Sequence, residues 1–305
     1  MKNMTVSFSP HIHDKITASR IMLDVVIALV PAFAASLFIF GPRAALVTAV
    51  CVSSCVLFEG IYQKLMKKPV TVNDLSAVVT GLLLAFNLPV EIPVWQAVFG
   101  CAVAILFVKQ LFGGLGKNFA NPAITARVVM FLAFSKTMTT WVQIDAVSSA
   151  TPLALMKRGE FGDLPGLWNM LAGSRGGSLG ETSALALLLG GIYLLIRRVI
   201  TWHTPAAFFG TVFVLAAVFG QEPLHHLLAG GLFLGAFFMA TDYPTTPKTN
   251  AGRVVFGAGC GVLTVIIRLY GNYPEGVAFS ILLMNMAVPY INKSTLRKAL
   301  GGKKG

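Results

Sequence analysis

Long apolar runs separated by short polar stretches make up most of this chain. Ten of the runs approach or reach the ~20 residues that a helix needs to span a bilayer. Five precede a less apolar loop over residues 137–182, at about 21–40, 43–62, 74–90, 93–112 and 120–136. Five follow it, at about 183–200, 205–220, 224–242, 252–270 and 275–291. The pattern predicts an all-α, polytopic membrane protein of about ten transmembrane helices. Its parts are a first membrane half over 1–136, the loop over 137–182, and a second half over 183–305 that ends in a C-terminal tail.

Lys and Arg residues are distributed unevenly among the predicted loops. With the N-terminus placed in the cytoplasm, 17 of the 24 basic residues fall inside, 6 fall outside and Arg127 lies within a span. An excess of Lys and Arg marks the cytoplasmic loops of membrane proteins. We therefore expect both termini in the cytoplasm and the loop 137–182 on the outer face. The same distribution explains the net charge of +12 without a nucleic-acid partner.

An odd number of helices in each half means that the two halves enter the membrane in opposite orientations. The third runs of the two halves, 75–89 and 226–244, are loosely similar, since both contain Gly and both end in a polar residue near Pro, Asn87 in one and Asp242 in the other. Paired, interrupted segments of an inverted repeat mark binding sites near the middle of the membrane. Chance similarity between two helices rich in Leu, Gly and Ala explains the likeness equally well.

The four cysteines all lie in apolar runs without a Cys-x-x-Cys pair, so we expect them to pack as small apolar side chains. The N-terminal segment has no clear cleavage pattern, which favours a retained first helix.

A glycine-rich loop, Gly113–Ala123, joins the fourth and fifth runs. It lacks the Gly-Lys-Ser/Thr spacing of a phosphate-binding loop, so a tight turn explains most of it. Asn121 followed by Pro122 predicts the N-cap and first residue of the fifth helix. The free amides at this helix start could face a ligand.

Three charged residues lie within or at the edge of apolar runs. Asp24 has Arg20 one turn earlier, which predicts a simple pair on one helix. For Arg127 and Asp242, a functional role and a structural one are equally good explanations, because charges inside a membrane are costly unless they are paired or used. Together with Asn121, these two residues are candidates for a second cofactor site or an ion path.

The predicted outer loop holds the string Asp145-Ala146-Val147-Ser148-Ser149-Ala150-Thr151-Pro152. Small polar residues before a Pro are typical of a surface turn, and a turn is a sufficient explanation for the string alone. The alternative is a modification site, because Thr151 before Pro152 is held extended and Ala150 leaves its hydroxyl uncrowded.

These motifs together resemble those of the D subunits of bacterial Rnf electron-transport complexes, a family related to the B subunit of the sodium-translocating NADH:quinone oxidoreductase. The resemblance covers nearly the full length, at Ser9–His11, Arg20–Leu29, Thr80–Pro89, Gly113–Ala123, Asp145–Thr151 and Met239–Pro244. The outer string is similar to the motif on which flavin transferases attach FMN to threonine, in which Asp145, Ser148 and Ala150 are the other motif residues. It departs from that motif at Ser149, where Gly is commoner.

The resemblance implies a bacterial inner-membrane protein with FMN bound to Thr151 through a phosphoester, and a second, non-covalent flavin such as riboflavin. It implies partner subunits A, B, C, E and G, a flavin transferase for maturation, and electron flow between ferredoxin and NAD coupled to sodium or proton movement. A small-solute transporter or channel is the alternative, because an inverted repeat suits it equally well.

Overall fold

The computed structural model describes residues 17–140, 151–159, 162, 164–173, 177–181, 183–271 and 276–296. Within these ranges the regular structure is entirely helical. The first half comprises α1 (Ala18–Phe40), α2 (Pro42–Leu65), η1 (Val72–Asp74), α3 (Ser76–Phe86), α4 (Val94–Ala102), the π-helix η2 (Val103–Gln110), α5 (Pro122–Ala133) and α6 (Ser135–Met138). Two short helices follow, α7 (Pro152–Arg158) and α8 (Leu167–Ala172). The second half comprises α9 (Ala184–Ile196), α10 (His203–Val218), α11 (Pro223–Leu228), α12 (Leu232–Leu234), the π-helix η4 (Gly235–Met239), η5 (Tyr243–Thr245), α13 (Asn250–Tyr270) and α14 (Gly276–Thr295).

Three of the described helices, α1, α2 and α13, are long and apolar enough to cross a membrane. Five further apolar helices are shorter, with lengths between 10 and 17 residues. The expected all-helical fold is therefore confirmed for the described residues, and the long apolar helices are consistent with a polytopic membrane protein. Several expected runs are shorter helices because polar or glycine residues end or interrupt them.

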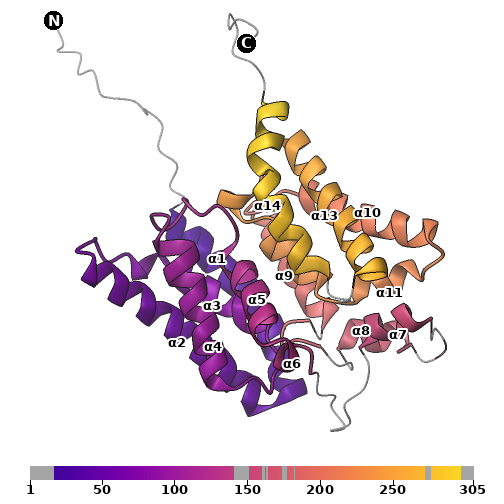
Figure 1. Cartoon of the computed structure of the whole chain (residues 1–305), viewed down its shortest axis with the longest axis horizontal. Coiled ribbons are helices and arrows are strands. Elements are labelled where there is room, and N and C mark those ends of the chain that lie inside the picture. Colours follow the sequence, from indigo (N-terminus) through magenta and orange to yellow (C-terminus); the bar gives the residue numbers. More distant parts are fainter. Residues whose placement is uncertain are drawn as a thin grey trace, which may run out of the picture.

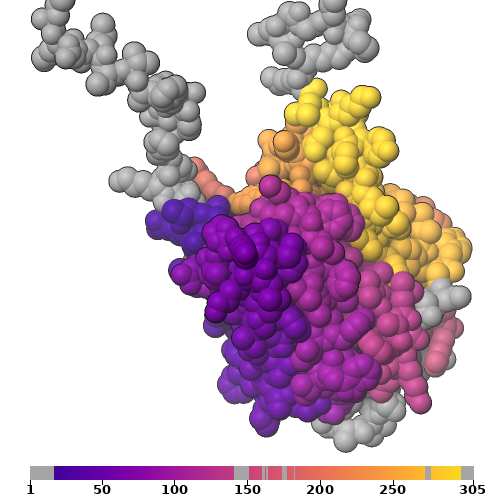
Figure 2. Space-filling model, turned by 60° about the vertical axis from the view of Figure 1, so that its left-hand side comes forward, coloured from indigo at the N-terminus to yellow at the C-terminus, as the bar shows by residue number. Residues whose placement is uncertain are grey.

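The two halves lie side by side, with α1–α5 on one side and α9–α14 on the other (Figure 1). The described chain ends, at the start of α1 and the end of α14, lie at one end of the molecule, and α7 and α8 lie at the opposite end (Figure 1). In the space-filling view, the magenta part of the chain that contains α5 lies between the indigo N-terminal helices and the yellow α14 (Figure 2). The centre of the molecule is thus built from both halves.

Small residues allow the longest helices to pack closely. On α13, a Cβ atom at Gly257 would lie 2.5 Å from the carbonyl oxygen of Thr204 on α10, and one at Gly261 would lie 2.7 Å from Cβ of Thr211. Glycines four residues apart let helix backbones approach in a membrane, where dispersion contacts rather than hydrophobic burial hold helices together. Helices α10 and α13 therefore pack closely against each other in the second half.

Asp24 connects the two halves rather than pairing along its own helix. Its carboxylate accepts hydrogen bonds from the Tyr193 hydroxyl at 2.9 Å and from Arg197 at 3.3 Å, on α9 and at its end. The prediction that Asp24 pairs with Arg20 is therefore wrong. Helix α9 packs against α1, so that Tyr193 and Arg197 donate to the carboxylate instead. All four cysteines are buried and free, as expected.

Candidate functional site

The start of α5 has the cap that the sequence predicts. The side-chain oxygen of Asn121 accepts hydrogen bonds from the amides of Ala123 at 3.0 Å and Ile124 at 3.3 Å, and Pro122 is the first helical residue. The cap therefore occupies the amides that could otherwise have faced a ligand.

Asn121 also joins the first half of the chain to the second. Its backbone amide donates to Oδ1 of Asn285 on α14 at 3.2 Å, and its side-chain amide donates to the carbonyl of Met239 at 3.5 Å. Asn285 in turn donates to the carbonyl of Thr245 at 3.0 Å. Both asparagines are buried, so these bonds satisfy backbone groups at and beyond the end of the π-helix η4.

The third runs of the two halves meet at the same point. Asn87, at the end of α3, donates to the carbonyl of Leu83 at 2.6 Å and lies 3.6 Å from the sulfur of Met239, the last residue of η4. The expectation that these two segments lie together at the centre of the bundle agrees with this contact. Asp242 follows three residues after Met239.

Two small cavities flank Asn121 and Asp242, and both residues line both cavities. One has a volume of about 60 Å³ and is otherwise mostly apolar, with side chains from α1, α3, α9 and η4. The other, of about 50 Å³, includes Ser76, Thr80, Lys109 and Asn118. Among the described residues Asp242 has no ion-pair partner, and its carboxylate accepts one side-chain hydrogen bond, from Thr245 at 3.1 Å.

Arg127 does not line either cavity. It lies further along α5, where it donates to the side chain of Asn87 and pairs with Glu181 at 3.3 Å. Both charged side chains are buried. The apolar pattern indicates no partner for Arg127, because Glu181 lies in the loop expected outside the membrane halves.

The segment that carries Glu181 reaches the centre because the end of α3 provides backbone partners for it. The amide of Leu179 donates to the carbonyl of Leu88 at 3.0 Å, and that of Gly180 donates to the carbonyl of Phe86 at 2.9 Å. Irregular backbone at membrane depth is tolerated only where protein groups satisfy it. Hydrophobic patterning carries no signal for such a segment.

The second half also contains a broken helix, with the break between α11 and α12. Gly230 and Gly231 have φ angles of +67° and +66°, which residues other than Gly rarely adopt. Arg268 on α13 donates to the carbonyl of His226 at 2.6 Å and to that of Ala229 at 2.8 Å. A cation at the carbonyl end of a helix is favourable both as a hydrogen-bond donor and by the helix dipole. The buried Arg268 therefore stabilises the break.

Helix α7 lies over this break and positions Thr151. Leu153 and Met156 on α7 form a small apolar cluster with Ala229 and with Met170 on α8. Thr151 is the N-cap of α7, with the extended backbone expected before Pro (φ −63°, ψ 154°), and its Oγ1 accepts from the amide of Ala154 at 3.3 Å. Its side chain is only partly buried. The other motif residues, Asp145, Ser148 and Ala150, lie outside the described residues.

A further polar cluster, around Lys109 and Glu59, was not predicted from the sequence. Lys109 on η2 pairs with Glu59 on α2 at 2.7 Å, and each side chain is only 1% exposed. Lys109 also donates to Ser76 at 2.6 Å, and Glu59 accepts from Gln110 at 2.8 Å. The distribution of basic residues placed Lys109 among the cytoplasmic charges, whereas in the structure the π-helix η2 places its side chain in the interior.

These features define a class of protein: an all-helical, polytopic membrane protein whose two halves meet at buried polar groups and broken helices. The chain belongs to the NQR2, RnfD, RnfE family, whose model matches residues 5–301.

Curated relatives align over nearly the full length of the chain. The D subunit of the Na(+)-translocating ferredoxin:NAD(+) oxidoreductase complex of Acetobacterium woodii is 50% identical over 304 residues, which is 98% of this chain and 96% of the relative. The D subunit of the proton-translocating ferredoxin:NAD(+) oxidoreductase complex of Clostridium ljungdahlii is 42% identical, over 95% of this chain and 94% of the relative. The D subunit of the ion-translocating oxidoreductase complex of Escherichia coli O157:H7 is 36% identical, over 98% and 99%. These names favour the electron-transport prediction over the transporter.

Proposed function

We propose that this chain is the flavin-carrying membrane component of a redox-driven ion pump, which passes electrons between ferredoxin and NAD and couples this transfer to sodium or proton movement. Family membership makes the chain one subunit of an ion-translocating oxidoreductase complex, so the other subunits of that complex are its partners. Subunits A, B, C, E and G are the partners proposed here. The relatives are named for different coupling ions, and both ions are retained in the proposal.

The proposal that FMN is attached to Thr151 rests on the Asp145–Thr151 string, and the position of Thr151 supports it. Thr151 is partly exposed, and Leu153 and Met156 hold α7 in place, so the attachment point is a fixed residue that a flavin transferase could reach. FMN would supply one- and two-electron chemistry when bound. The residues of this chain would fix its location and set its surroundings.

Co-expression with the flavin transferase, followed by in-gel flavin fluorescence, tests this attachment. Thr151→Ala should remove the covalent fluorescence while membrane insertion is retained. Thr140→Ala is the matched control, because Thr140 is an exposed threonine whose one hydroxyl bond among the described residues is to the carbonyl of Lys136, one turn earlier. A covalently fluorescent Thr151→Ala chain would refute the assignment and direct attention to Ser148 and Ser149.

For the second site we propose the region of Asn121 and Asp242. The two cavities there are several-fold smaller than the ~300–1,000 Å³ of pockets that hold drug-sized ligands. A non-covalent flavin such as riboflavin would therefore have to displace the apolar side chains that both cavities share, Met22, Val79 and Leu83. A cation or a few water molecules would fit either cavity without such movement.

A change at the carboxylate of Asp242 can show which of the two occupants, a cation or a non-covalent flavin, binds at this site. Asp242 is half-buried beside the two cavities, and a carboxylate withdrawn from water is costly unless a cation accompanies it, so a coupling ion would stabilise it. Asp242→Asn keeps the shape and removes the charge. In the assembled complex we expect ion uptake into vesicles to fall further than electron transfer. Equal loss of both, together with loss of a non-covalent flavin measured after acid extraction, would favour the flavin. Unchanged activities would refute a role in either.

The membrane orientation is also a proposal. The described chain ends lie at one end of the molecule and α7 lies at the other, which fits an even number of spans (Figure 1). We propose the expected ten spans in two inverted five-helix halves, with cytoplasmic termini in a bacterial inner membrane. In a cysteine-free background, a cysteine at Gly173 should react with an impermeant maleimide on intact cells, and one at Lys303 should not. The opposite pattern would refute this orientation.

A further inference from the structure

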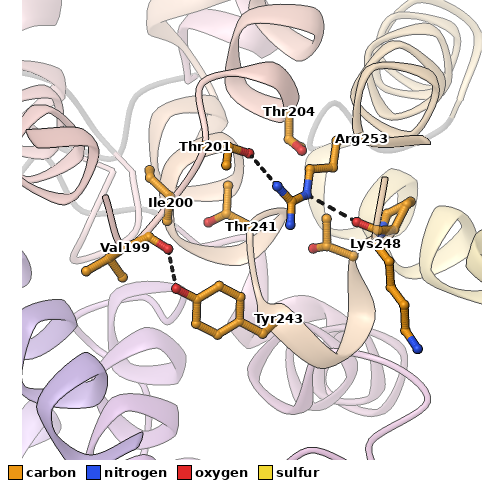
Figure 3. Close-up of a pocket in the computed structure, with 10 residues that line it drawn as sticks. Val199, Ile200, Thr201, Thr204, Thr241, Tyr243, Lys248 and Arg253 are labelled. Atoms are coloured by element: carbon orange, nitrogen blue, oxygen red, sulfur yellow. Dashed lines mark hydrogen bonds between the residues drawn. The ribbon is translucent and has the colours of Figure 1, made fainter. Parts of the chain in front are cut away.

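A pocket of about 190 Å³ lies apart from the proposed flavin attachment point, at the end of the second half where α9 ends and where α10 and α13 begin. Its ten lining residues include no Asp or Glu and two basic residues: Val199, Ile200, Thr201, Thr204, Thr241, Tyr243, Thr246, Pro247, Lys248 and Arg253 (Figure 3). A pocket with cations and hydroxyls but no carboxylate suits an anion.

Arg253 provides the central donor. Its Nε donates to the carbonyl of Pro247 at 3.2 Å, and its Nη1 donates to Thr201 at 3.2 Å and to Asn250 at 3.4 Å. These bonds fix the plane of the guanidinium. The remaining nitrogen, Nη2, has no hydrogen-bond partner among the described residues, and it points into the space between Thr241 and Lys248 (Figure 3). Two N–H donors are therefore pre-positioned toward the pocket.

Two hydroxyls can add to this donor set. Thr201 accepts from Arg253, so its own O–H remains free to donate. Thr204 has no side-chain hydrogen bond within the described part of the chain, and its side chain lines the same pocket (Figure 3). By contrast, Thr241 and Thr246 donate to the carbonyls of Phe237 and Ala240. Lys248 also lines the pocket, and its exposed side chain runs away from Arg253, so it adds a second positive charge only at the rim (Figure 3).

The depth of the pocket indicates the source of the anion. The hydrogen bond between Thr249 and Thr295, at 2.8 Å, places the start of α13 beside the end of α14, at the end of the molecule where the described chain ends lie. Trp202, which adjoins the pocket in sequence and stacks on His203, is 62% exposed. Exposed Trp and Tyr residues at helix ends are typical of the level of lipid headgroups. The pocket therefore opens where phosphate groups of lipids are concentrated.

We propose that this pocket binds the phosphate group of an anionic phospholipid headgroup. Its volume is below the ~300 Å³ at which pockets for drug-sized ligands begin, so it is too small for a flavin or a nucleotide, but it has room for a phosphate and a few further atoms. Basic pockets between membrane helices bind such headgroups through the same charge-assisted hydrogen bonds. The bound lipid would hold together the end of α9, the start of α10 and the start of α13. The inference does not rest on the FMN proposed at Thr151, and the pocket adjoins the cavity beside Asp242, with which it shares Val199, Ile200, Thr241 and Tyr243.

Equilibrium binding of a fluorescent short-chain phosphatidylglycerol to the purified full-length chain in detergent tests the proposal, with a fluorescent diacylglycerol as the probe that lacks phosphate. We expect Arg253→Gln to raise the Kd about tenfold, since a charge-assisted donor pair is lost. Lys248→Gln should raise it about threefold, as expected for an exposed charge. Lys293→Gln, an exposed lysine in the last turn of α14, is the matched control and should leave the Kd unchanged.

Folding is checked by size-exclusion profile and circular dichroism. Arg253→Gln removes hydrogen bonds within the protein and could therefore disturb folding. The Lys248 side chain makes no hydrogen bond among the described residues, so we expect Lys248→Gln to fold normally. This variant therefore tests the proposal even if Arg253→Gln does not fold. Equal Kd values for the Lys248→Gln and Lys293→Gln chains would overturn the proposal, as would equal binding of the diacylglycerol. Inorganic phosphate should not displace the lipid at comparable concentration. If it did, free phosphate would be the ligand and the lipid assignment would be wrong.

Discussion

Removing one partner of the buried pair of Glu59 and Lys109 should destabilise the protein strongly, because the other charge would be left buried without a counter-charge. Each side chain is 1% exposed and the charged atoms are 2.7 Å apart. Replacing Lys109 by Met keeps much of the length and apolar volume of the side chain but removes the cation. The carboxylate of Glu59 then keeps its bonds from Gln110 at 2.8 Å and Gln63 at 3.3 Å without a counter-charge. Removing one partner of a buried pair typically costs about 3–5 kcal/mol, and we expect Lys109→Met to fall in this range.

The double variant separates pairing from packing. In Glu59→Gln/Lys109→Met neither charge of the pair remains, and the glutamine can still accept from Gln110. Replacing a whole buried pair by neutral groups is often close to neutral for stability. We therefore expect the double variant to lose less than the Lys109→Met variant alone, with a coupling between the sites of about 2 kcal/mol or more.

The assay is unfolding by SDS in mixed micelles, followed by the loss of helical circular dichroism. Lys64→Met is the control, because Lys64 is exposed on the same helix as Glu59, α2, and surface changes of this kind stay within about 0.5 kcal/mol. A loss below about 1 kcal/mol for Lys109→Met, or additive losses in the double variant, would show that the pair does not act as a unit and would refute the reasoning.

Three further substitutions should lower the melting temperature measured by intrinsic fluorescence. Gly231→Ala places a Cβ 2.5 Å from a buried carboxylate oxygen at a φ of +66° and should cost about 2 kcal/mol, whereas Gly210→Ala, in open space on α10, should be neutral or stabilising. Asn121→Ala removes a cap and should cost about 1–2 kcal/mol, against no change for the exposed Asn73→Ala. Arg268→Gln loses two charge-assisted bonds to carbonyls and should cost about 3 kcal/mol. A variant that melted like its control, or like the parent chain for Arg268→Gln, would contradict the corresponding argument.

Local sequence was sufficient for features whose cause is local. The apolar runs predicted helices because a chain in lipid must satisfy its own backbone groups. The pair Asn121-Pro122 predicted a helix start, and the structure has that cap, because a side-chain acceptor next to a residue without an amide favours one backbone geometry. Thr151 before Pro152 was predicted to be extended for the same kind of reason, and it is.

Tertiary structure decided which charged and polar groups meet. Asp24 was expected to pair with Arg20 one turn away, yet its partners are Tyr193 and Arg197, 169 and 173 residues further along the chain. Arg127 has Glu181 as its partner only because the 177–181 segment folds back onto the end of α3. Such pairings depend on how helices are packed, and no local pattern records that packing.

The pocket proposed to bind lipid phosphate shows the same division. Its residues are spread over 199–253 and are individually ordinary: threonines near helix ends and two basic residues in a loop and a first helical turn. The charge pattern alone predicted only that this end of the molecule is basic. That one guanidinium nitrogen of Arg253 faces a cavity follows from the bonds that fix its other two nitrogens. Charge content is thus a property of the sequence, whereas the direction in which a donor points is set by packing, because the bonds that fix it come from different parts of the fold.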